Sequence, residues 1–288
     1  MPVREWKGCR INLNNYPFAG KMLVTDMDGT LLDRRSRISD ENQRAIKRFI
    51  AGGGLFTVAT GRMFKAVEPY LPVLPMNLPA IVYNGAAIYD FSMKKLLWQN
   101  CLTDNIADVA EDLLRQFPGI GLEVFHGEDL YLPAQNAVTD RHMIREGFHP
   151  VFACLKDIPR PWIKLLIASN PEKLLEVEAF LKARKEEFHA VYSESQFLEL
   201  LNKNVTKGSA LKRLAEMANL PCEAIVAMGD NKNDLEMLLE AGTGVAVKNA
   251  HKDVITAADL VCSRHDNDAV AEVIRWIEDG TIKSNVAV

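Results

Sequence analysis

The stretch Lys21-Met-Leu-Val-Thr-Asp26-Met-Asp28-Gly-Thr-Leu-Leu-Asp33 joins an apolar run to two carboxylates one residue apart and a Gly-Thr turn. The run predicts a buried strand that delivers Asp26 and Asp28 to its carboxyl end. In an open parallel α/β sheet that edge is where ligands bind, so acids placed there favour chemistry. Turns are also rich in Asp and Gly for conformational reasons, so a simple turn is the alternative for this motif alone.

Three further segments repeat this order of an apolar strand followed by polar residues. They are residues 55–59 before Thr60-Gly61-Arg62, residues 80–83 before Asn84-Gly85, and residues 224–228 before Gly229-Asp230-Asn231-Lys232-Asn233-Asp234. Between the second and the last lies Thr206-Lys207-Gly208, directly before a helical pattern. One short motif is weak evidence, but several motifs in a fixed order are far less expected by chance.

The ordered motifs resemble those of the haloacid dehalogenase superfamily. Within it, the chain is most similar to the Cof-type phosphatases, which share Thr-Gly-Arg, Asn-Gly-Ala and Gly-Asp-Asn-x-Asn-Asp-x-x-Met-Leu. The similarity runs from about residue 21 to residue 271, with a weakly matched middle. It implies an α/β fold with a Rossmann-like parallel-sheet core and an inserted α/β cap domain. It also implies a phosphatase that acts on a small phosphomonoester, with a sugar phosphate as the favoured class.

Cleavage of a phosphate monoester needs a nucleophile, a proton donor for the leaving oxygen, and positive charge near the phosphoryl oxygens. Asp26 is the expected nucleophile, which forms an aspartyl-phosphate. Two residues on in an extended chain, a side chain points to the same face, so Asp28 reaches the same site if the backbone bends at Gly29. We expect Asp28 to protonate the leaving group and then to activate water, a role worth about 10²–10⁴-fold in rate.

Five residues are expected to contact the phosphoryl group: Met27, Thr60, Gly61, Lys207 and Asn233. Thr60 supplies a hydroxyl donor, and Gly61 lets its amide approach closely because it has no side chain. Lys207 contributes a compact charge to both the phosphate and Asp26. Taken alone, Thr60 is better explained as a strand-end cap and Lys207 as a solvated surface residue.

A cation is predicted because two or three carboxylates facing a dianionic phosphate would repel it. Mg²⁺ suits the site as a hard ion that takes oxygen ligands and keeps several waters. The resemblance implies the Asp26 carboxylate, the Asp28 backbone carbonyl and the Asp230 carboxylate as its protein ligands. Asp234 is expected close by, where it orients these ligands or binds the ion through water.

Competing ligand motifs do not fit the sequence. An EF-hand loop beginning at Asp230 fails, because its third position is Lys232 and its required glycine position holds Leu235. A helix N-cap with acids in the first turn is compatible with the same residues. Gly242-x-Gly244 follows a helical pattern where a dinucleotide motif should follow a strand, and there is no Walker sequence.

Motif spacing predicts the domain organisation. From Asp26 to Thr60 there are 34 residues, room for one helix and the next strand, and that helix has Ser39 as its N-cap and residues 52–54, three glycines, as its stop. From Thr60 to Lys207 there are 147 residues, which must contain a second domain. We therefore predict a catalytic core at 21–86 and 202–288, a substrate-specificity cap at 87–201, and an unassigned extension at 1–20.

The insert has its own alternation of helices and strands. Helices are expected at 104–117 and from residue 171, strands at 122–125, 130–132, 162–168, 190–192 and 197–200. This pattern predicts an α/β cap built from two α-β-β halves. Four polar residues on these segments either face the site or lie on the exposed surface, and the exposed surface is the expectation: His126, Asp129, Tyr131 and Lys164.

Composition favours a cytoplasmic enzyme. The 288 residues are 48% hydrophobic and 25% charged, enough for one substantial core or two moderate ones. A net charge of -4 gives no footprint for nucleic acid, and no apolar run reaches membrane length. No signal peptide is visible, and the cysteines are scattered, which argues for reduced thiols and against zinc or disulfides: Cys9, Cys101, Cys154, Cys222 and Cys262. The expected partner is a small phosphorylated metabolite, and the oligomeric state is not predicted.

Other functions remain as alternatives. A phosphotransferase would use the same aspartyl-phosphate but exclude water. A mutase is disfavoured by the short first interval, since the mutase cap in this superfamily usually lies there. A dehalogenase or phosphonate hydrolase does not require the proton donor that Asp28 supplies. A non-catalytic protein that binds a phosphorylated ligand is the last alternative, and release of phosphate from an aryl phosphate with Mg²⁺ discriminates against it.

Overall fold

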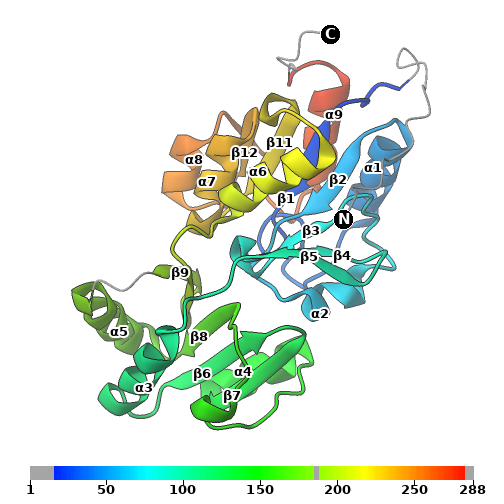
Figure 1. Cartoon of the computed structure of the whole chain (residues 1–288). Coiled ribbons are helices and arrows are strands. Elements are labelled where there is room, and N and C mark those ends of the chain that lie inside the picture. Colours follow the sequence, from blue (N-terminus) through cyan, green and yellow to red (C-terminus); the bar gives the residue numbers. More distant parts are fainter. Residues whose placement is uncertain (1–15, 185–187, 283–288) are drawn as a thin grey trace.

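The computed structural model describes residues 16–184 and 188–282, which form three sheets with helices packed on them (Figure 1). Most of the predicted extension at 1–20, with Cys9, lies outside these ranges. Residues 16–20 do belong to the packed structure, because Phe18 is buried and its ring lies 4.8 Å from that of Phe49.

A five-stranded parallel sheet carries most of the sequence motifs. Its order is β13-β12-β11-β1-β2, with bounds β1 Met22–Thr25, β2 Leu55–Val58, β11 Ile225–Gly229, β12 Thr243–Val247 and β13 Leu260–Cys262. In this order β1 is flanked by β2 and by β11, and Met22 pairs with Leu55 on one side and Ile225 on the other. The predicted Rossmann-like parallel sheet is confirmed.

Helices cover both faces of the parallel sheet because its strands are apolar on both faces. Along β1, Leu23 packs into one apolar cluster, and Met22 and Val24 pack into another. The first cluster contains apolar residues of α1 and α9, and the second contains those of α6, α7 and α8. The bounds are α1 Asp40–Ala51, α6 Lys207–Ala218, α7 Leu235–Glu240, α8 Lys252–Ala257 and α9 Ala269–Glu278. The predicted cap of α1 is present, since Ser39 Oγ accepts a hydrogen bond from Asn42 N at 3.1 Å.

A second, antiparallel sheet is formed by residues of the insert. Its order is β7-β6-β8-β10-β9, with bounds β6 Gly121–His126, β7 Asp129–Ala134, β8 Lys164–Ala168, β9 Phe188–Glu194 and β10 Phe197–Asn202. Helices α3 (Ile106–Gln116) and α5 (Pro171–Arg184) pack on one face. The other face, which carries Phe125 and Phe197, packs with Met143 of α4 (Ala137–Glu146). Helix α4 is absent from the predicted elements, and in the structure Asn136 and Thr139 form a capping box at its start.

A small antiparallel sheet, β3-β4-β5, lies beside β2. Its strands are β3 Ala80–Val82, β4 Ala87–Asp90 and β5 Lys95–Gln99, and a bridge between Ala59 and Ile81 joins it to the end of β2. One short helix, α2 (Phe64–Val67), follows β2, and single 3₁₀ turns lie at Glu68–Tyr70, Tyr83–Gly85, Leu155–Asp157, Cys222–Ala224 and Lys232–Asp234. The division into a core at 21–86 and 202–288 and a cap at 87–201 stays a prediction.

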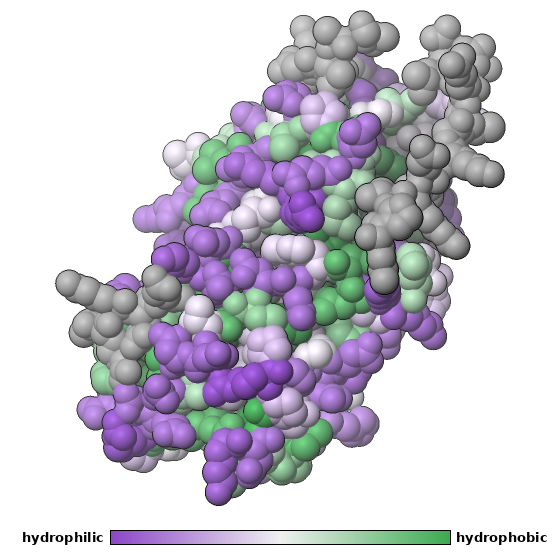
Figure 2. Space-filling model, viewed as in Figure 1, coloured by the Kyte–Doolittle hydropathy of each residue, from purple (hydrophilic) through white to green (hydrophobic). Residues whose placement is uncertain are grey.

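The surface in view is largely polar, and the described cysteines form no disulfide. Polar residues cover much of the face seen in Figure 2, with apolar residues in smaller areas between them. Among the described residues, no helix is both long and apolar enough to cross a membrane. The four described cysteines are free thiols: Cys101, Cys154, Cys222 and Cys262.

Candidate active site

Asp26 lies directly after β1, at the carboxyl edge of the parallel sheet, where its backbone N donates to Met228 O of β11 at 2.9 Å. Lys207 opens α6 and points its buried side chain at this strand end. Its Nζ donates to Asp26 Oδ1 and to Asp234 Oδ1, each at 2.6 Å. Burial disfavours the charge on Lys207, but Asp234 and Asp26 outweigh it and raise its pKa above the ordinary value. The alternative of a solvated surface lysine is therefore wrong.

Three carboxylates gather at this point. Oxygen atoms of Asp26, Asp230 and Asp234 all lie within 4.8 Å of one another. Burial raises the pKa of Asp26 well above its usual range; Lys207 opposes this, and Asp234 and Asp230 add to it. Burial and the charge of Asp234 likewise raise the pKa of Asp230 to about 7. Three mutually repelling acids beside one lysine favour binding of a further cation.

The donor set fits Mg²⁺, and the three acids are not equivalent. Asp234 Oδ1 accepts from Lys207, and its Oδ2 accepts from the backbone N of Asp230 at 2.9 Å and of Asn231 at 3.0 Å. Because both of its carboxylate oxygens already accept hydrogen bonds, Asp234 is suited to orienting the groups around it. Asp230 accepts a long bond from Thr30 Oγ1 at 3.4 Å, which leaves its carboxylate more available as a ligand, together with that of Asp26.

Gly29 makes room for Asp230. Its φ of +84° lies in the region that glycine adopts readily, as the bend expected after Asp28 requires. A Cβ atom at this position would lie 2.4 Å from Asp230 Oδ2. The residue is therefore fixed both by the backbone conformation and by the carboxylate next to it.

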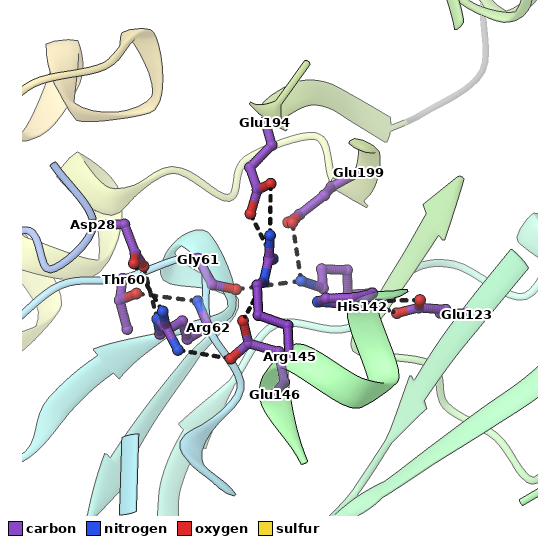
Figure 3. Close-up of polar contacts among 11 residues, drawn as sticks. Asp28, Thr60, Gly61, Arg62, Glu123, His142, Arg145, Glu146, Glu194 and Glu199 are labelled. Atoms are coloured by element: carbon purple, nitrogen blue, oxygen red, sulfur yellow. Dashed lines mark hydrogen bonds and ion pairs between the residues drawn. The ribbon is translucent and has the colours of Figure 1, made fainter. Parts of the chain in front are cut away.

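Asp28 is held by Arg62, which belongs to the Thr-Gly-Arg motif but is not among the predicted site residues. Arg62 Nε and Nη2 donate to the two Asp28 oxygens at 2.7 and 2.8 Å, and Nη1 donates to Glu146 of α4 at 2.6 Å (Figure 3). Two parallel bonds from a guanidinium fix the plane of a carboxylate. Arg62 therefore orients Asp28 and also joins it to the insert.

The other residues predicted to contact the phosphate are Met27, Thr60, Gly61 and Asn233. Met27 has a fully buried side chain, so any contact it makes must come from its backbone. Thr60 is also buried, and its Oγ1 accepts from Arg62 N at 3.1 Å, which leaves the hydroxyl hydrogen free for another partner. Gly61 and Asn233 line a cavity that Asp26, Asp28 and Asp230 also line.

This cavity measures about 90 Å³ and is lined in part by residues of the insert. Residues of the second sheet and of α4 contribute to its wall, among them His142, Arg145 and Lys164. The expectation that Lys164 is exposed is wrong, since only 3% of its surface is accessible. The segment was recognised as a strand, but nothing in its pattern showed which sheet face meets the site.

Comparison with known proteins agrees with this geometry. A model of the haloacid dehalogenase-like hydrolase family matches residues 23–274. The chain belongs to that family. A solved haloacid dehalogenase-like hydrolase from Bacteroides thetaiotaomicron is 29% identical, with a TM-score of 0.79 over 89% of this chain and 99% of that one.

Curated relatives of this haloacid dehalogenase-like hydrolase carry phosphatase names. A putative phosphatase of Haemophilus influenzae is 27% identical over 88% of this chain and 97% of its own length. The 5-amino-6-(5-phospho-D-ribitylamino)uracil phosphatase YwtE of Bacillus subtilis is 29% identical over 90% of this chain and 99% of its own length. The family and these relatives support an enzyme of the phosphatase class and confirm the predicted Cof-type branch.

Proposed function

We propose that the protein is a Mg²⁺-dependent phosphatase that hydrolyses a small phosphomonoester through an aspartyl-phosphate on Asp26. The observation that carries the proposal is the buried cluster in which Lys207 bridges Asp26 and Asp234, with Asp230 alongside. A lysine that neutralises a buried nucleophile, next to a site for a divalent ion, suits attack on an anionic ester.

The chain's own residues supply the steps. An oxygen of Asp26 bonds to phosphorus as the bond to the leaving oxygen breaks, and Asp28 gives that oxygen its proton. Asp28 then takes a proton from water, whose oxygen attacks phosphorus and releases Asp26 and inorganic phosphate. Mg²⁺, held by the Asp26 and Asp230 carboxylates and the Asp28 carbonyl, would offset the charge of the phosphoryl oxygens.

We propose a sugar phosphate as the substrate class and residues 87–201 as the cap that selects it. The relative YwtE is named for a substrate whose phosphate sits on a ribityl chain. Charged and hydrogen-bonding groups such as His142, Arg145 and Ser193 line the cavity beside Asp28, and these suit a leaving group with several hydroxyls. Cytoplasmic localisation stays a prediction.

A phosphate-release screen tests this function. Purified protein with Mg²⁺ is assayed against aryl phosphates, sugar phosphates, nucleotides, flavin and pyridoxal phosphates, ranked by kcat/KM, with EDTA-treated protein and Asp26→Asn as controls. Release of phosphate that depends on Mg²⁺ and Asp26 supports the proposal. Transfer of phosphate to an added alcohol without net release would indicate a phosphotransferase, and no release from any ester a non-catalytic binding protein.

A further inference from the structure

Lys164 and Glu199 form an ion pair that is buried on the site-facing side of the second sheet. They lie on the paired strands β8 and β10, their Nζ and Oε1 atoms are 3.1 Å apart, and each side chain is 3% exposed. The ammonium also lies 4.5 Å from the Phe125 ring centroid. A buried ion pair is weak evidence of a stabilising role, because desolvation offsets most of the attraction. The hydrogen bonds that Lys164 and Glu199 make to other residues indicate the role of the pair.

The lysine reaches one peptide of the predicted phosphate-binding loop. Lys164 Nζ donates to Gly61 O at 3.2 Å. The same peptide carries the N–H of Arg62, which donates to Thr60 Oγ1 at 3.1 Å. One peptide plane is thus held at its carbonyl by Lys164 and at its amide by Thr60, as Figure 3 shows for Gly61, Arg62 and Thr60. Because Oγ1 accepts this bond, Lys164 also influences where the Thr60 hydroxyl hydrogen can point.

The glutamate reaches a second predicted phosphate contact through Asn84. Glu199 Oε2 accepts from Asn84 Nδ2 at 2.7 Å, and Asn84 Oδ1 accepts from Asn233 Nδ2 at 2.9 Å. An ionised carboxylate only accepts hydrogen bonds, so it fixes the amide of Asn84, and Asn84 in turn fixes that of Asn233. Asn84 itself is buried, and its two hydrogen bonds place it between Glu199 and Asn233.

On the basis of the phosphatase proposed above, we propose that Lys164 and Glu199 are positioning residues for phosphate binding. The pair sits in the insert, yet its contacts end at Thr60, Gly61 and Asn233 on the catalytic side. The insert would then set the affinity for the phosphoryl group itself, in addition to any contact with the leaving group. Inorganic phosphate, which has no leaving group, is the probe that isolates this effect.

The main test removes both charges with Lys164→Met/Glu199→Leu. Removing both partners leaves no unpaired buried charge, but Asn84 Nδ2 and Gly61 O lose a hydrogen-bond partner, so the double variant is expected to unfold at a moderately lower temperature than the wild type. Its dissociation constant for inorganic phosphate, measured calorimetrically with Mg²⁺, should rise about three- to tenfold, as expected for loss of one or two hydrogen bonds. The kcat/KM values should fall by a similar factor for esters with different leaving groups.

Two further variants keep the result decisive. Glu199→Gln retains the shape of the side chain and should also weaken phosphate binding, but it leaves the Lys164 ammonium without its buried counterion and should lower the unfolding temperature more than the double variant does. Lys65→Met is the matched control. Lys65 of α2 also contacts the insert, since its Nζ lies 3.9 Å from Asp129 Oδ1, but this ion pair is exposed. It should leave both phosphate affinity and kcat/KM unchanged.

Distinct outcomes would overturn the positioning role. Unchanged phosphate affinity with losses in kcat/KM that vary with the leaving group would make Lys164 and Glu199 leaving-group contacts. A lower unfolding temperature with unchanged phosphate affinity would make the pair purely structural. If the wild-type protein binds phosphate but hydrolyses no ester, only the proposed function is refuted. The phosphate affinities of the variants would still decide the positioning role.

Discussion

Mg²⁺ binding should strengthen steeply as pH rises through neutrality. Burial and the neighbouring Asp234 raise the pKa of Asp230 to about 7 in the metal-free protein. The ion needs the ionised carboxylate, so each bound Mg²⁺ must displace the proton that Asp230 holds below that pH. Asp26, whose pKa is raised as well, adds a second proton to be displaced in acid.

The size of this effect follows from the pKa. For one group that ionises near pH 7, the apparent dissociation constant increases by the factor 1 + 10^(pKa − pH). This factor is about 33 at pH 5.5 and about 1.1 at pH 8, so Mg²⁺ should bind about 30-fold more weakly at the lower pH. The contribution of Asp26 would make the difference larger.

Calorimetric titration with Mg²⁺ from about pH 5.5 to pH 8 measures this dependence without any turnover. Repeating the titration in buffers of different ionisation enthalpy counts the protons released. Asp230→Asn should weaken binding and flatten the pH dependence, whereas Asp253→Asn, an exposed acid on α8, should change neither. A dissociation constant that stays the same across this range would refute the reasoning.

The raised pKa of Asp230 also predicts how the stability of the metal-free protein changes with pH. The folded carboxyl of Asp230 binds its proton more tightly than the unfolded one, whose pKa is near 4. Between about pH 4 and pH 7 the folded state therefore holds more protons, and its stability falls as pH rises. Saturating Mg²⁺ should reverse this trend, and thermal unfolding with and without the ion checks it.

Three substitutions test the roles of single residues. Asp26→Asn should abolish turnover with the fold intact, because the nucleophile and a metal ligand are lost together, and a loss of only a few-fold in kcat would contradict its role. Asp28→Asn should lower kcat about 10²–10⁴-fold for alkyl phosphates and much less for aryl phosphates, whose leaving groups need less protonation; equal losses would argue against it as proton donor. Lys207→Ala should destabilise the metal-free protein by about 3–5 kcal/mol, because Asp26 and Asp234 lose their buried counterion, and chemical denaturation with an unchanged midpoint would contradict this.

The acids of the site were predictable because each follows a strand whose apolar run is visible in the sequence. Asp26 and Asp230 end β1 and β11, which are neighbours in the sheet, so strand assignment alone brings them to one edge. Lys207 was found by its place in the ordered motifs and not by its own surroundings. The catalytic and phosphate-binding roles of these residues stay predictions.

The contacts between the insert and the acids were not predictable in the same way. Arg62 and Glu146 are 84 residues apart, and Asn84 and Glu199 are 115 apart. Which of these side chains meet depends on how the second sheet packs, and no local pattern carries that information. Helix α4, which brings Glu146 to Arg62, is capped by Asn136 and Thr139, and this pair lacks the Glu or Gln that marks a capping box in a sequence.

The place of β1 between β2 and β11 has a consequence for synthesis of the chain. The partner of Met22 on one side, Leu55, is only 33 residues further along the chain, but its other neighbour, Ile225, is 203 residues further on. At about 5–20 residues per second, one edge of β1 waits roughly 10–40 s for its partner. A nascent chain thus carries an apolar strand with open backbone groups for most of its translation, and it is most exposed to aggregation or chaperone capture in that interval. Asp26 and Asp230 come together only when β11 has been synthesised, so a chain arrested before it should have no activity.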